Sequence, residues 1–330
     1  MSVIVPCYNE QATIGALLAA IHDQTYPRER LEVVIADGLS EDGTRDAIAA
    51  FQQAHPTLSV RLVDNGKRTI PAGLNRAIGA AEGEFIIRLD AHSKPIPEYV
   101  QRCVEALQAG KGTNVGGVWQ IVPGAKGRTA AAIAAAAAHP LGAGNALYRV
   151  GGAAGAVDTV PFGAFRRSLI DEIGGFDEQL RSNEDYEFNV RINKHGGVVW
   201  MDPAIKSTYY ARTTLAALAR QYWRYGFWKF RMLVRYPTSL RWRQAIPPTF
   251  VLAVLTLAAA AIFWTPALIA LVIIGSVYAL ALLAASVQLS ARAGDLLLLP
   301  ALMLAFATVH FAWGGGFLAS IPSWWVHSNG

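Results

Sequence analysis

Three groups of polar residues, whose types suit ligand binding or catalysis, each follow directly on an apolar run. They are Cys7–Glu10, Asp37–Gly38 and Asp90–His92. Each apolar run has the length and the β-branched content of a buried strand. In open α/β sheets, ligands bind at the edge where the carboxyl ends of the parallel strands meet. We therefore expect the three groups to form one site.

The acidic residues of two of these groups suit the recognition of a nucleoside diphosphate. Asp37 can accept a hydrogen bond from the imide N–H of a nucleobase, although an Asp in a turn also serves as a helix cap. Asp90 can hold Mg²⁺ or Mn²⁺, and such a cation bridges diphosphate oxygens and neutralises the departing nucleotide. His92 is interpreted as a second metal ligand or a diphosphate contact, and a simple loop residue is the alternative.

A further acidic pair, Glu184 and Asp185, stands just ahead of a helix predicted at 186–194. Asp185 can remove a proton from an acceptor hydroxyl as a general base. Glu184 beside it would raise the pKa of Asp185 and is assigned to the catalytic pair with it. Favourable charge at a helix N-terminus is the structural alternative for both residues.

A helix predicted at 215–236 is dense in aromatic and basic residues, which suit the headgroup layer of a membrane. Gln221, Arg224 and Tyr225 fall at i, i+3 and i+4, so they share one face of this helix. An arginine on that face could clamp a phosphate, so the three are candidates for contact with an acceptor or a diphosphate. A lipid-facing anchor is the alternative.

Strands and helices alternate in the first 110 residues, which implies an α/β fold with a mostly parallel sheet and helices on both faces. The predicted strands are Val3–Val5, Leu31–Ala36, Ser59–Asp64 and Glu84–Leu89, and the predicted helices are Gln11–Gln24, Thr44–Ala54 and Pro71–Ala81. Further on, the alanine-rich run Ala130–Ala138 predicts a packed helix, and Val198–Met201 predicts a short strand.

The charge of the chain is concentrated in its first 245 residues, since residues 246–330 contain only two charged side chains, Arg292 and Asp295. Three apolar stretches follow one another in this region, at about 246–264, 267–289 and 296–320. Each has roughly the 20 residues that a helix needs to cross a hydrocarbon core. The sequence therefore predicts a soluble domain at 1–212, amphipathic interfacial helices at 213–244 and a transmembrane region of three helices at 245–330.

The basic residues at Arg241–Arg243 and Arg292 lie beside the predicted spans and belong on the cytoplasmic side by the positive-inside rule. This predicts a multi-pass protein of the inner membrane with its first domain in the cytoplasm. Because the sequence opens directly with a predicted strand, no signal peptide is expected. The two cysteines lie far apart in the sequence, which fits a reducing compartment. The net charge of +5 and the pI near 9.2 fit anionic lipids or phosphorylated substrates. No nucleic-acid-binding motif is present, so no nucleic acid partner is expected.

As an ordered set, these groups resemble the family 2 glycosyltransferases of the GT-A fold, within residues 2–231. The resemblance is carried by Val3–Glu10, Asp37–Thr44, Asp90–His92, Gly163–Arg167, Gly174–Asp177 and Asn183–Asp185. The form Asp-Ala-His at 90–92, with Ser207–Tyr210 and Gln221–Gly226, is most similar to the succinoglycan-type exopolysaccharide glucosyltransferases.

The resemblance implies a nucleotide-sugar-binding domain with divalent metal and an inverting reaction. Asp185 is then the catalytic base and Asp90 the metal ligand. The residues assigned to the nucleotide-sugar pocket are Pro6, Tyr8, Glu10, Asp37, Lys67 and Asp90.

Three positions depart from the family pattern. His92 stands where an Asp is usual, and no His is present near Tyr209–Tyr210. The resemblance therefore does not fix the full set of metal ligands. Tyr225 stands where processive synthases carry Trp. Together with only three spans, this argues against extrusion of a growing chain.

The leading hypothesis is transfer of a single sugar, glucose from UDP-glucose, to a polyprenyl-diphosphate-linked saccharide at the cytoplasmic membrane face. The partners would be a UDP-sugar donor, a lipid-linked saccharide acceptor and the membrane. A polyprenyl-phosphate sugar transferase is the second hypothesis, because a lipid phosphate is itself a nucleophile. A non-catalytic membrane scaffold that binds a nucleotide sugar is the third.

Overall fold

The computed structural model describes residues 1–328, which form two compact units. The first unit comprises Met1–Gln120 and Gly151–Tyr209, and the second comprises Ile121–Val150 and the chain from Tyr210 onward. The chain therefore passes from the first unit to the second at residue 121, returns to the first unit at residue 151 and enters the second unit again at residue 210. The predicted first domain, 1–212, includes residues 121–150, and the limits of 1–212, 213–244 and 245–330 stay a prediction.

Nine strands of the described chain form one sheet. Its order is β3-β2-β1-β4-β8-β6-β9-β5, and β7 pairs with β9. The strands are β1 (Ser2–Cys7), β2 (Glu32–Asp37), β3 (Ser59–Asp64), β4 (Phe85–Arg88), β5 (Lys94–Pro95), β6 (Asn114–Pro123), β7 (Gly155–Ala156), β8 (Ala164–Arg166) and β9 (Val199–Ala211).

The four strands predicted from the first 110 residues are β1 to β4, and they run parallel to one another. The α/β fold class is therefore confirmed. Beyond β4 the sheet continues with antiparallel pairs, β4 with β8 and β8 with β6. In register, Cys7 lies opposite Asp37 and Asp37 opposite Asp64, so the carboxyl ends of β1, β2 and β3 are level.

The predictions missed β6 and foresaw only the start of β9. Gly116 and Gly117 weaken the strand signal of β6, because glycine is depleted in strands. A Cβ on Gly117 would lie 1.8 Å from the carbonyl oxygen of Ile205, so only glycine lets β6 approach β9 this closely.

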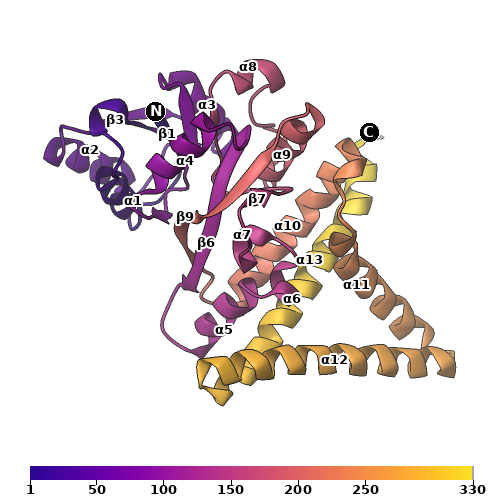
Figure 1. Ribbon diagram of the computed structural model, residues 1–330. Coiled ribbons are helices and arrows are strands. Elements are labelled where there is room, and N and C mark those ends of the chain that lie inside the picture. The colour runs from indigo at the N-terminus through magenta and orange to yellow at the C-terminus, as the bar shows by residue number, and fades with distance from the viewer. Residues whose placement is uncertain (329–330) are drawn as a thin grey trace. The chain divides into compact units, whose positions relative to one another are not determined.

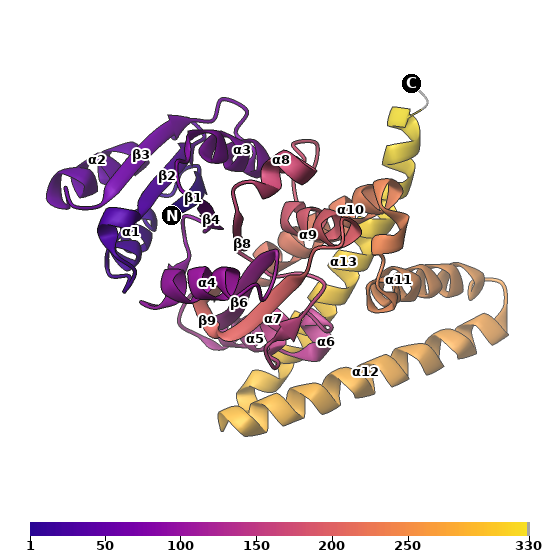
Figure 2. The same cartoon turned by 45° about the horizontal axis from the view of Figure 1, so that its top comes forward.

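Alternate residues of the parallel strands face a core formed with helices on one side of the sheet. Val3, Val5, Val33 and Ile35 are buried in one cluster with apolar residues of α1, α2 and α4. α3 packs on β1, β2 and β3. The helices of this unit are α1 (Ile14–His22), α2 (Thr44–Ala54), α3 (Ile70–Ala80), α4 (Tyr99–Gln108), α8 (Leu169–Ile173) and α9 (Glu184–Lys194), with the 3₁₀ turn η1 (Arg28–Arg30) (Figure 2).

The second unit is helical over most of its length (Figure 1). Its elements are α5 (Arg128–Ala137), α6 (Pro140–Ala143), α7 (Leu147–Val150), α10 (Leu215–Arg235), η2 (Pro237–Ser239), α11 (Trp242–Ala260), α12 (Thr265–Ala293), η3 (Leu296–Leu298) and α13 (Leu299–Ser328). Within the described chain, three stretches are long and apolar enough to cross a membrane: Trp242–Ala260, Thr265–Ala293 and Leu296–Ser323. They fall where the three spans were predicted.

The helix α10 lies along α13 (Figure 1). The two backbones approach closely at glycines. A Cβ on Gly226 of α10 would lie 2.0 Å from the carbonyl oxygen of Trp313. A Cβ on Gly316 of α13 would lie 2.2 Å from the carbonyl oxygen of Trp223. Small residues at such crossings are typical of helices that pack in membranes, where close backbone contact replaces the hydrophobic effect.

The glycine contact predicts a stability difference between two matched glycine substitutions. Gly226→Ala forces α10 away from α13, and overpacking of this kind costs about 1–3 kcal/mol. Gly275→Ala, in α12, meets no atom within 4 Å and gains helix propensity, so we expect unchanged or higher stability. Thermal unfolding of both variants in the same detergent measures the difference. An equal loss of stability in the two variants would contradict the close packing of α10 on α13.

Candidate active site

The loops that follow β1, β2 and β3 each contain a non-glycine residue in the left-handed backbone region. These are Asn9, Leu39 and Arg68, with φ of 53°, 59° and 53°. Such a conformation is unfavourable for Leu and Arg and persists only where the surroundings enforce it. The three strained turns lie at the edge of the sheet where the sequence predicts the site.

Asp37 lies at the end of β2 with its carboxylate fully buried. It accepts hydrogen bonds from the Ser40 backbone N–H at 3.0 Å and from Arg45 Nε at 2.5 Å. Arg45 also donates from Nη2 to Asp64 at 2.5 Å and is 37% exposed. The pocket therefore presents Arg45 to solvent with Asp37 behind it, and direct contact of Asp37 with a base stays a prediction.

Tyr8 is half exposed and packs against the Gly38 backbone, where a Cβ would come within 3.0 Å of the ring. The Arg68 guanidinium lies 5.5 Å from the ring centroid, within range of a cation–π interaction. Pro6 of β1 precedes Tyr8, and a Cβ on Gly73 of α3 would lie 3.3 Å from the Pro6 side chain. Tyr8 and Arg68 together form a surface on which a flat ring could stack.

Lys67, assigned to the nucleotide-sugar pocket, forms an ion pair with Glu178 Oε2 at 2.6 Å. Both side chains reach solvent, so the pair contributes little stability, and Lys67 can exchange Glu178 for another anion. The role of Lys67 in binding a phosphate stays a prediction.

Glu10 and His92 meet across the loops that follow β1 and β4. His92 Nδ1 lies 3.0 Å from Glu10 Oε1, and Thr13 Oγ1 donates to Glu10 Oε2 at 2.5 Å. Burial alone would raise the pKa of Glu10, but the hydrogen bonds from His92 and Thr13 outweigh it and the net pKa is lowered. Glu10 is therefore ionised at neutral pH, and it orients the His92 imidazole through this contact.

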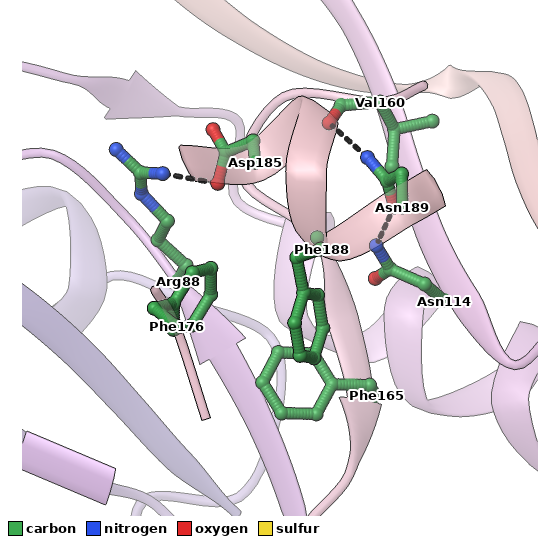
Figure 3. Close-up of a pocket in the computed structure, with 9 residues that line it drawn as sticks. Arg88, Asn114, Val160, Phe165, Phe176, Asp185, Phe188 and Asn189 are labelled. Atoms are coloured by element: carbon green, nitrogen blue, oxygen red, sulfur yellow. Dashed lines mark hydrogen bonds and ion pairs between the residues drawn. The ribbon is translucent and has the colours of Figure 1, made fainter. Parts of the chain in front are cut away.

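The centre of the site is the guanidinium of Arg88, in β4 (Figure 3). Its side chain is 4% exposed. Nη2 donates to Asp90 Oδ1 and to Glu184 Oε1, each at 3.0 Å, and Nη1 donates to Asp185. One buried cation thus collects the predicted metal ligand and both predicted catalytic acids.

The pKa of Asp185 is raised to about 7. Burial is the main cause, the Arg88 cation opposes it, and the charges of Glu184 and Asp90 add to it. The side chain keeps 28% of its surface exposed, so an acceptor can reach it. A carboxylate with these properties is matched to proton removal near neutral pH.

Glu184 and Asp185 lie in the first turn of α9, so the helix begins two residues before its predicted start. Asn183, in the left-handed region with φ of 67°, precedes them and turns the chain into the helix. Inside the unit, Phe188 of α9 packs on Phe176 and Phe165, with ring centroids 4.7 and 5.1 Å apart (Figure 3). This packing fixes the helix that carries the acids.

The loop before α9 is fastened to α3 through a single side chain. Asn75 Nδ2 donates to the Phe176 carbonyl at 2.8 Å, and Asn75 Oδ1 accepts from the Phe176 N–H at 2.8 Å. A Cβ on Gly175 would lie 2.5 Å from Asn75 Oδ1, which explains the glycine there. The family-like run Gly174–Asp177 therefore has a structural role in holding the acidic helix.

The donors at this edge fit a divalent cation that binds together with a diphosphate. Asp90 offers a carboxylate that is 22% exposed, and His92 offers an imidazole nearby in the chain. Among residues 1–328, no group of three or more His, Cys, Asp or Glu side chains is arranged to hold a metal alone. Mg²⁺ in nucleotide sites uses one or two carboxylates and takes further ligands from phosphate and water, so the set is compatible with such an ion.

The residues Gln221, Arg224 and Tyr225 belong to α10, in the second unit. Gln221 is buried and donates from Nε2 to the Tyr225 hydroxyl at 2.9 Å, whereas Arg224 is exposed. Gln221 and Tyr225 are thus joined on the helix, and the role of the three residues toward an acceptor or a diphosphate stays a prediction.

Sequence reasoning missed Arg88, Arg45 and Asn75. For Arg88 a signal was present: a lone cation inside the apolar run Phe85–Leu89 has to be paired when the strand is buried, and acids are its only charged partners. Nothing in the local sequence marks Asn75, because its partner lies about 100 residues away.

The parallel sheet with strained turns and acids at its carboxyl edge is the arrangement of glycosyltransferases with the GT-A fold. The model of the family "Glycosyl transferase family 2" matches residues 2–174. The chain belongs to this family.

Two relatives and one solved structure define the neighbourhood of the chain. It is 31% identical over 317 residues to the succinoglycan biosynthesis protein ExoA of Rhizobium meliloti (strain 1021), covering 96% of this chain and 93% of that one. It is 29% identical over 246 residues to the dolichyl N-acetyl-alpha-D-glucosaminyl phosphate 3-beta-D-2,3-diacetamido-2,3-dideoxy-beta-D-glucuronosyltransferase of Methanococcus voltae, covering 73% and 76%. The mannosyltransferase PcManGT from Pyrobaculum calidifontis, in complex with GDP-Man and Mn²⁺, has the same fold, with a TM-score of 0.62, 24% identity and coverage of 93% and 86%.

The Arg88 network predicts a graded response to substitution. Arg88→Met leaves three carboxylates facing one another without a cation, so they repel and Asp185 loses its position. We expect turnover to fall at least about 100-fold, because a misplacement of 1 Å can cost that much. Arg88→Lys restores the charge without the fork and should recover part of it. Turnover number and donor KM, with thermal stability measured alongside, check this; equal turnover in Met and Lys variants would contradict it.

Proposed function

We propose that the protein transfers a single sugar, glucose from UDP-glucose, to a polyprenyl-diphosphate-linked saccharide, with inversion at the anomeric carbon. The observation that carries the proposal is the convergence of Asp90, Glu184 and Asp185 on the buried Arg88. Arg88 holds Asp90, which suits a metal ion on the donor diphosphate, close to Asp185, which suits a general base. A donor and an acceptor hydroxyl can therefore react in one step at this edge.

Asp185 is the group that takes the proton. As the acceptor oxygen attacks the anomeric carbon, its hydroxyl proton passes to the Asp185 carboxylate, and the bond from that carbon to the diphosphate oxygen breaks. The nucleoside diphosphate leaves on the opposite face, so an α-linked donor gives a β-linked product. Glu184 supports the reaction by its charge, which helps to raise the pKa of Asp185.

The donor would lie over the loops after β1, β2 and β4. Tyr8 and Arg68 offer a stacking surface for the base, and Arg45 with Asp37 offers polar partners for its edge. Asp90 and His92 would hold Mg²⁺ or Mn²⁺, which neutralises the charge of the leaving diphosphate. Lys67 would exchange its ion pair with Glu178 for an ion pair with a phosphate of the donor. The GDP-Man and Mn²⁺ bound by the Pyrobaculum neighbour support a nucleotide sugar with a divalent metal.

The acceptor assignment rests on the second unit and on the relatives. Three helices that are long and apolar enough to cross a membrane support a membrane location, and the aromatic and basic α10 precedes them. The relative from Methanococcus voltae is named for adding a β-linked sugar to a dolichyl-phosphate-linked one, and ExoA for succinoglycan biosynthesis. We place the catalytic unit on the cytoplasmic side, because Arg241, Arg243 and Arg292 flank the spans.

The base assignment is tested by Asp185→Asn, which keeps the shape of the side chain and removes the proton acceptor. We expect transfer to a hydroxyl acceptor to fall at least about 100-fold, the lower limit of general base catalysis, with UDP affinity nearly unchanged. The measurement is product formation with lipid-linked oligosaccharides, beside calorimetric titration with UDP. Near-normal turnover with a lipid phosphate acceptor would instead favour a polyprenyl-phosphate sugar transferase, because a phosphate needs little proton removal.

The metal assignment is tested by Asp90→Asn with UDP titrations in the presence and absence of Mn²⁺. In the unchanged protein, Mn²⁺ should strengthen UDP binding, since the cation neutralises the diphosphate. In the variant this gain should be mostly lost, while binding without metal stays similar. A gain from Mn²⁺ that survives in the variant would contradict the role of Asp90.

A further inference from the structure

The third apolar stretch, which forms η3 and α13, has the length of a membrane span, but α10 accompanies its second half. The two helices touch at the glycines described above, and their contact continues toward the end of α13. The rings of Phe230 and Phe317 lie 5.4 Å apart, centroid to centroid. Arg231 Nη2 donates to Ser323 Oγ at 3.3 Å. The second half of α13 therefore lies at the same depth in a membrane as α10.

The helix α10 is too basic to lie in hydrocarbon. It contains no acidic residue, and α13 contains no Asp, Glu, Lys or Arg. Basic side chains at the centre of a bilayer are strongly unfavourable, whereas aromatic and basic residues together suit the headgroup layer. We therefore assign α10 to the headgroup layer, and the second half of α13 belongs there with it. The basic residues of α10 are Arg220, Arg224, Lys229, Arg231 and Arg235.

The start of the third apolar stretch is polar. Arg128 Nε donates to Asp295 Oδ2 at 2.8 Å, and Asp295 directly precedes η3. Both side chains reach solvent, so this end of the stretch lies outside hydrocarbon. Arg292 stands three residues before Asp295, in the last turn of α12. The stretch therefore begins at a membrane surface.

The middle of α13 lies beside a segment that leads to the same surface. The His139 ring lies 5.5 Å from the Phe306 ring, centroid to centroid, and the charge of Arg292 in α12 acts on His139. A few residues further on, a Cβ on Gly144 would lie 3.4 Å from Arg243 Cδ, at the start of α11. The segment packed on α13 at Phe306 thus adjoins the charged ends of both α11 and α12.

The helices α11 and α12 have the features of a membrane hairpin. No Asp, Glu, Lys or Arg occurs between Arg243 and Arg292, and this length exceeds the roughly 40 residues that two crossings need. The turn between the helices exposes apolar side chains, and Phe263 there is 90% exposed. Both arginines stand at the other end of the hairpin, on one side of the membrane. Two helices thus suffice to anchor the chain.

The helix α13 meets α11 near the charged end of the hairpin. A Cβ on Gly314 would lie 2.5 Å from the carbonyl oxygen of Pro247, one turn after Arg243. The Tyr278 hydroxyl, near the middle of α12, reaches His310 Nδ1 at 3.0 Å. α12 has 29 residues and is about 44 Å long, against about 30 Å of hydrocarbon, so it crosses at a tilt. A tilt brings the middle of α12 nearer to the surface, where a tyrosine can reach a shallow α13.

We propose that α13 lies in the headgroup layer beside α10, and that only α11 and α12 cross the membrane. The partner of the α10–α13 pair is the layer of phospholipid headgroups, whose phosphates match the cations of α10. The prediction of three spans is thereby reduced to two. The end of α13 then stays on the side of the first unit, from which the chain continues into α10. The inference is independent of donor, acceptor and reaction.

The side of the membrane is measured with single cysteines added to the full chain in its cell membrane. Gln53→Cys, an exposed position in α2, reports the first unit, and a short polar extension that ends in cysteine, placed after Gly330, reports the C-terminus. The native Cys7 and Cys103 are buried, and burial raises the pKa of the Cys7 thiol to about 12, so they stay in place unlabelled.

A membrane-impermeant maleimide is applied to intact cells and to inverted membrane vesicles. We expect the two reporters to label in the same preparation, because the chain between them crosses the membrane twice. Phe263→Cys, in the turn of the hairpin, is the control for the far side and should label in the other preparation. Labelling of Gln53→Cys and of the C-terminal cysteine in opposite preparations would overturn the proposal.

The depth of α10 is measured with nitroxide labels in phospholipid nanodiscs. Arg220→Cys, one turn before Trp223 in α10, is compared with Leu280→Cys, near the middle of α12, and both positions are exposed. We expect the label at 220 to collide severalfold more with a water-soluble nickel chelate than with oxygen, and the label at 280 to show the reverse. A label at 220 that favours oxygen as strongly as the label at 280, in a variant of normal thermal stability, would refute the shallow α10–α13 pair. Loss of sugar transfer alone would not alter either readout.

Discussion

The site depends on one buried cation. Arg88 is removed from water at the end of β4, and an isolated charge in such a place is strongly unfavourable. Asp90, Glu184 and Asp185 supply the compensating charge, and they in turn could not lie so close together without the guanidinium. The dependence is mutual, so the position of α9 and the path of the chain after β4 are fixed together. An arginine suits this task because its donors are set in a rigid fork, and each carboxylate is therefore directed as well as neutralised. The same network explains why Asp185 keeps a pKa of about 7 despite the cation beside it: burial and two further acids outweigh one positive charge.

The rest of the first unit can be understood as support for this network. The parallel register brings the ends of β1, β2 and β3 level, so their loops form one rim. The loops hold left-handed residues that only a well-packed sheet enforces. On the far side of Arg88, the aromatic ring of Phe188 anchors α9 in the core, and Asn75 holds the loop before it through both backbone groups of Phe176. Ionic contacts alone do not define a position in space, and here the apolar packing supplies what they lack.

The sequence predicted those parts of the molecule that local patterns determine. Ser59–Asp64 was predicted with the bounds of β3, and the strands before Asp37 and Asp90 fall where the apolar runs are, because a buried strand needs few residues and all of them apolar. Contacts between segments that are distant in the sequence could not be predicted from local patterns. The glycines of β6 weaken its strand signal, and they are needed only because the backbone of Ile205 in β9 comes so close. The alanines of α5 are compatible with a soluble core and with a membrane bundle, so the local sequence does not decide between them. Glu184 and Asp185 were recognised as a pair, but their common partner Arg88 was not, although its charge inside a strand was visible.

The two units solve the same physical problem in opposite ways. Near Arg88, the protein buries full charges and compensates each with a charge of opposite sign, which concentrates a strong electric field at the candidate site. Along α13, neutral groups bond to one another: His310 donates to the Leu141 carbonyl and accepts from the Tyr278 hydroxyl, and His139 accepts from the Leu141 N–H. This division has a consequence for the acceptor, because a lipid-linked sugar carries its charge at the headgroup and its chain in hydrocarbon. The second unit contains both the basic residues of α10 and neutral polar groups along α13, so it offers groups of the kind that each half of such a molecule would need.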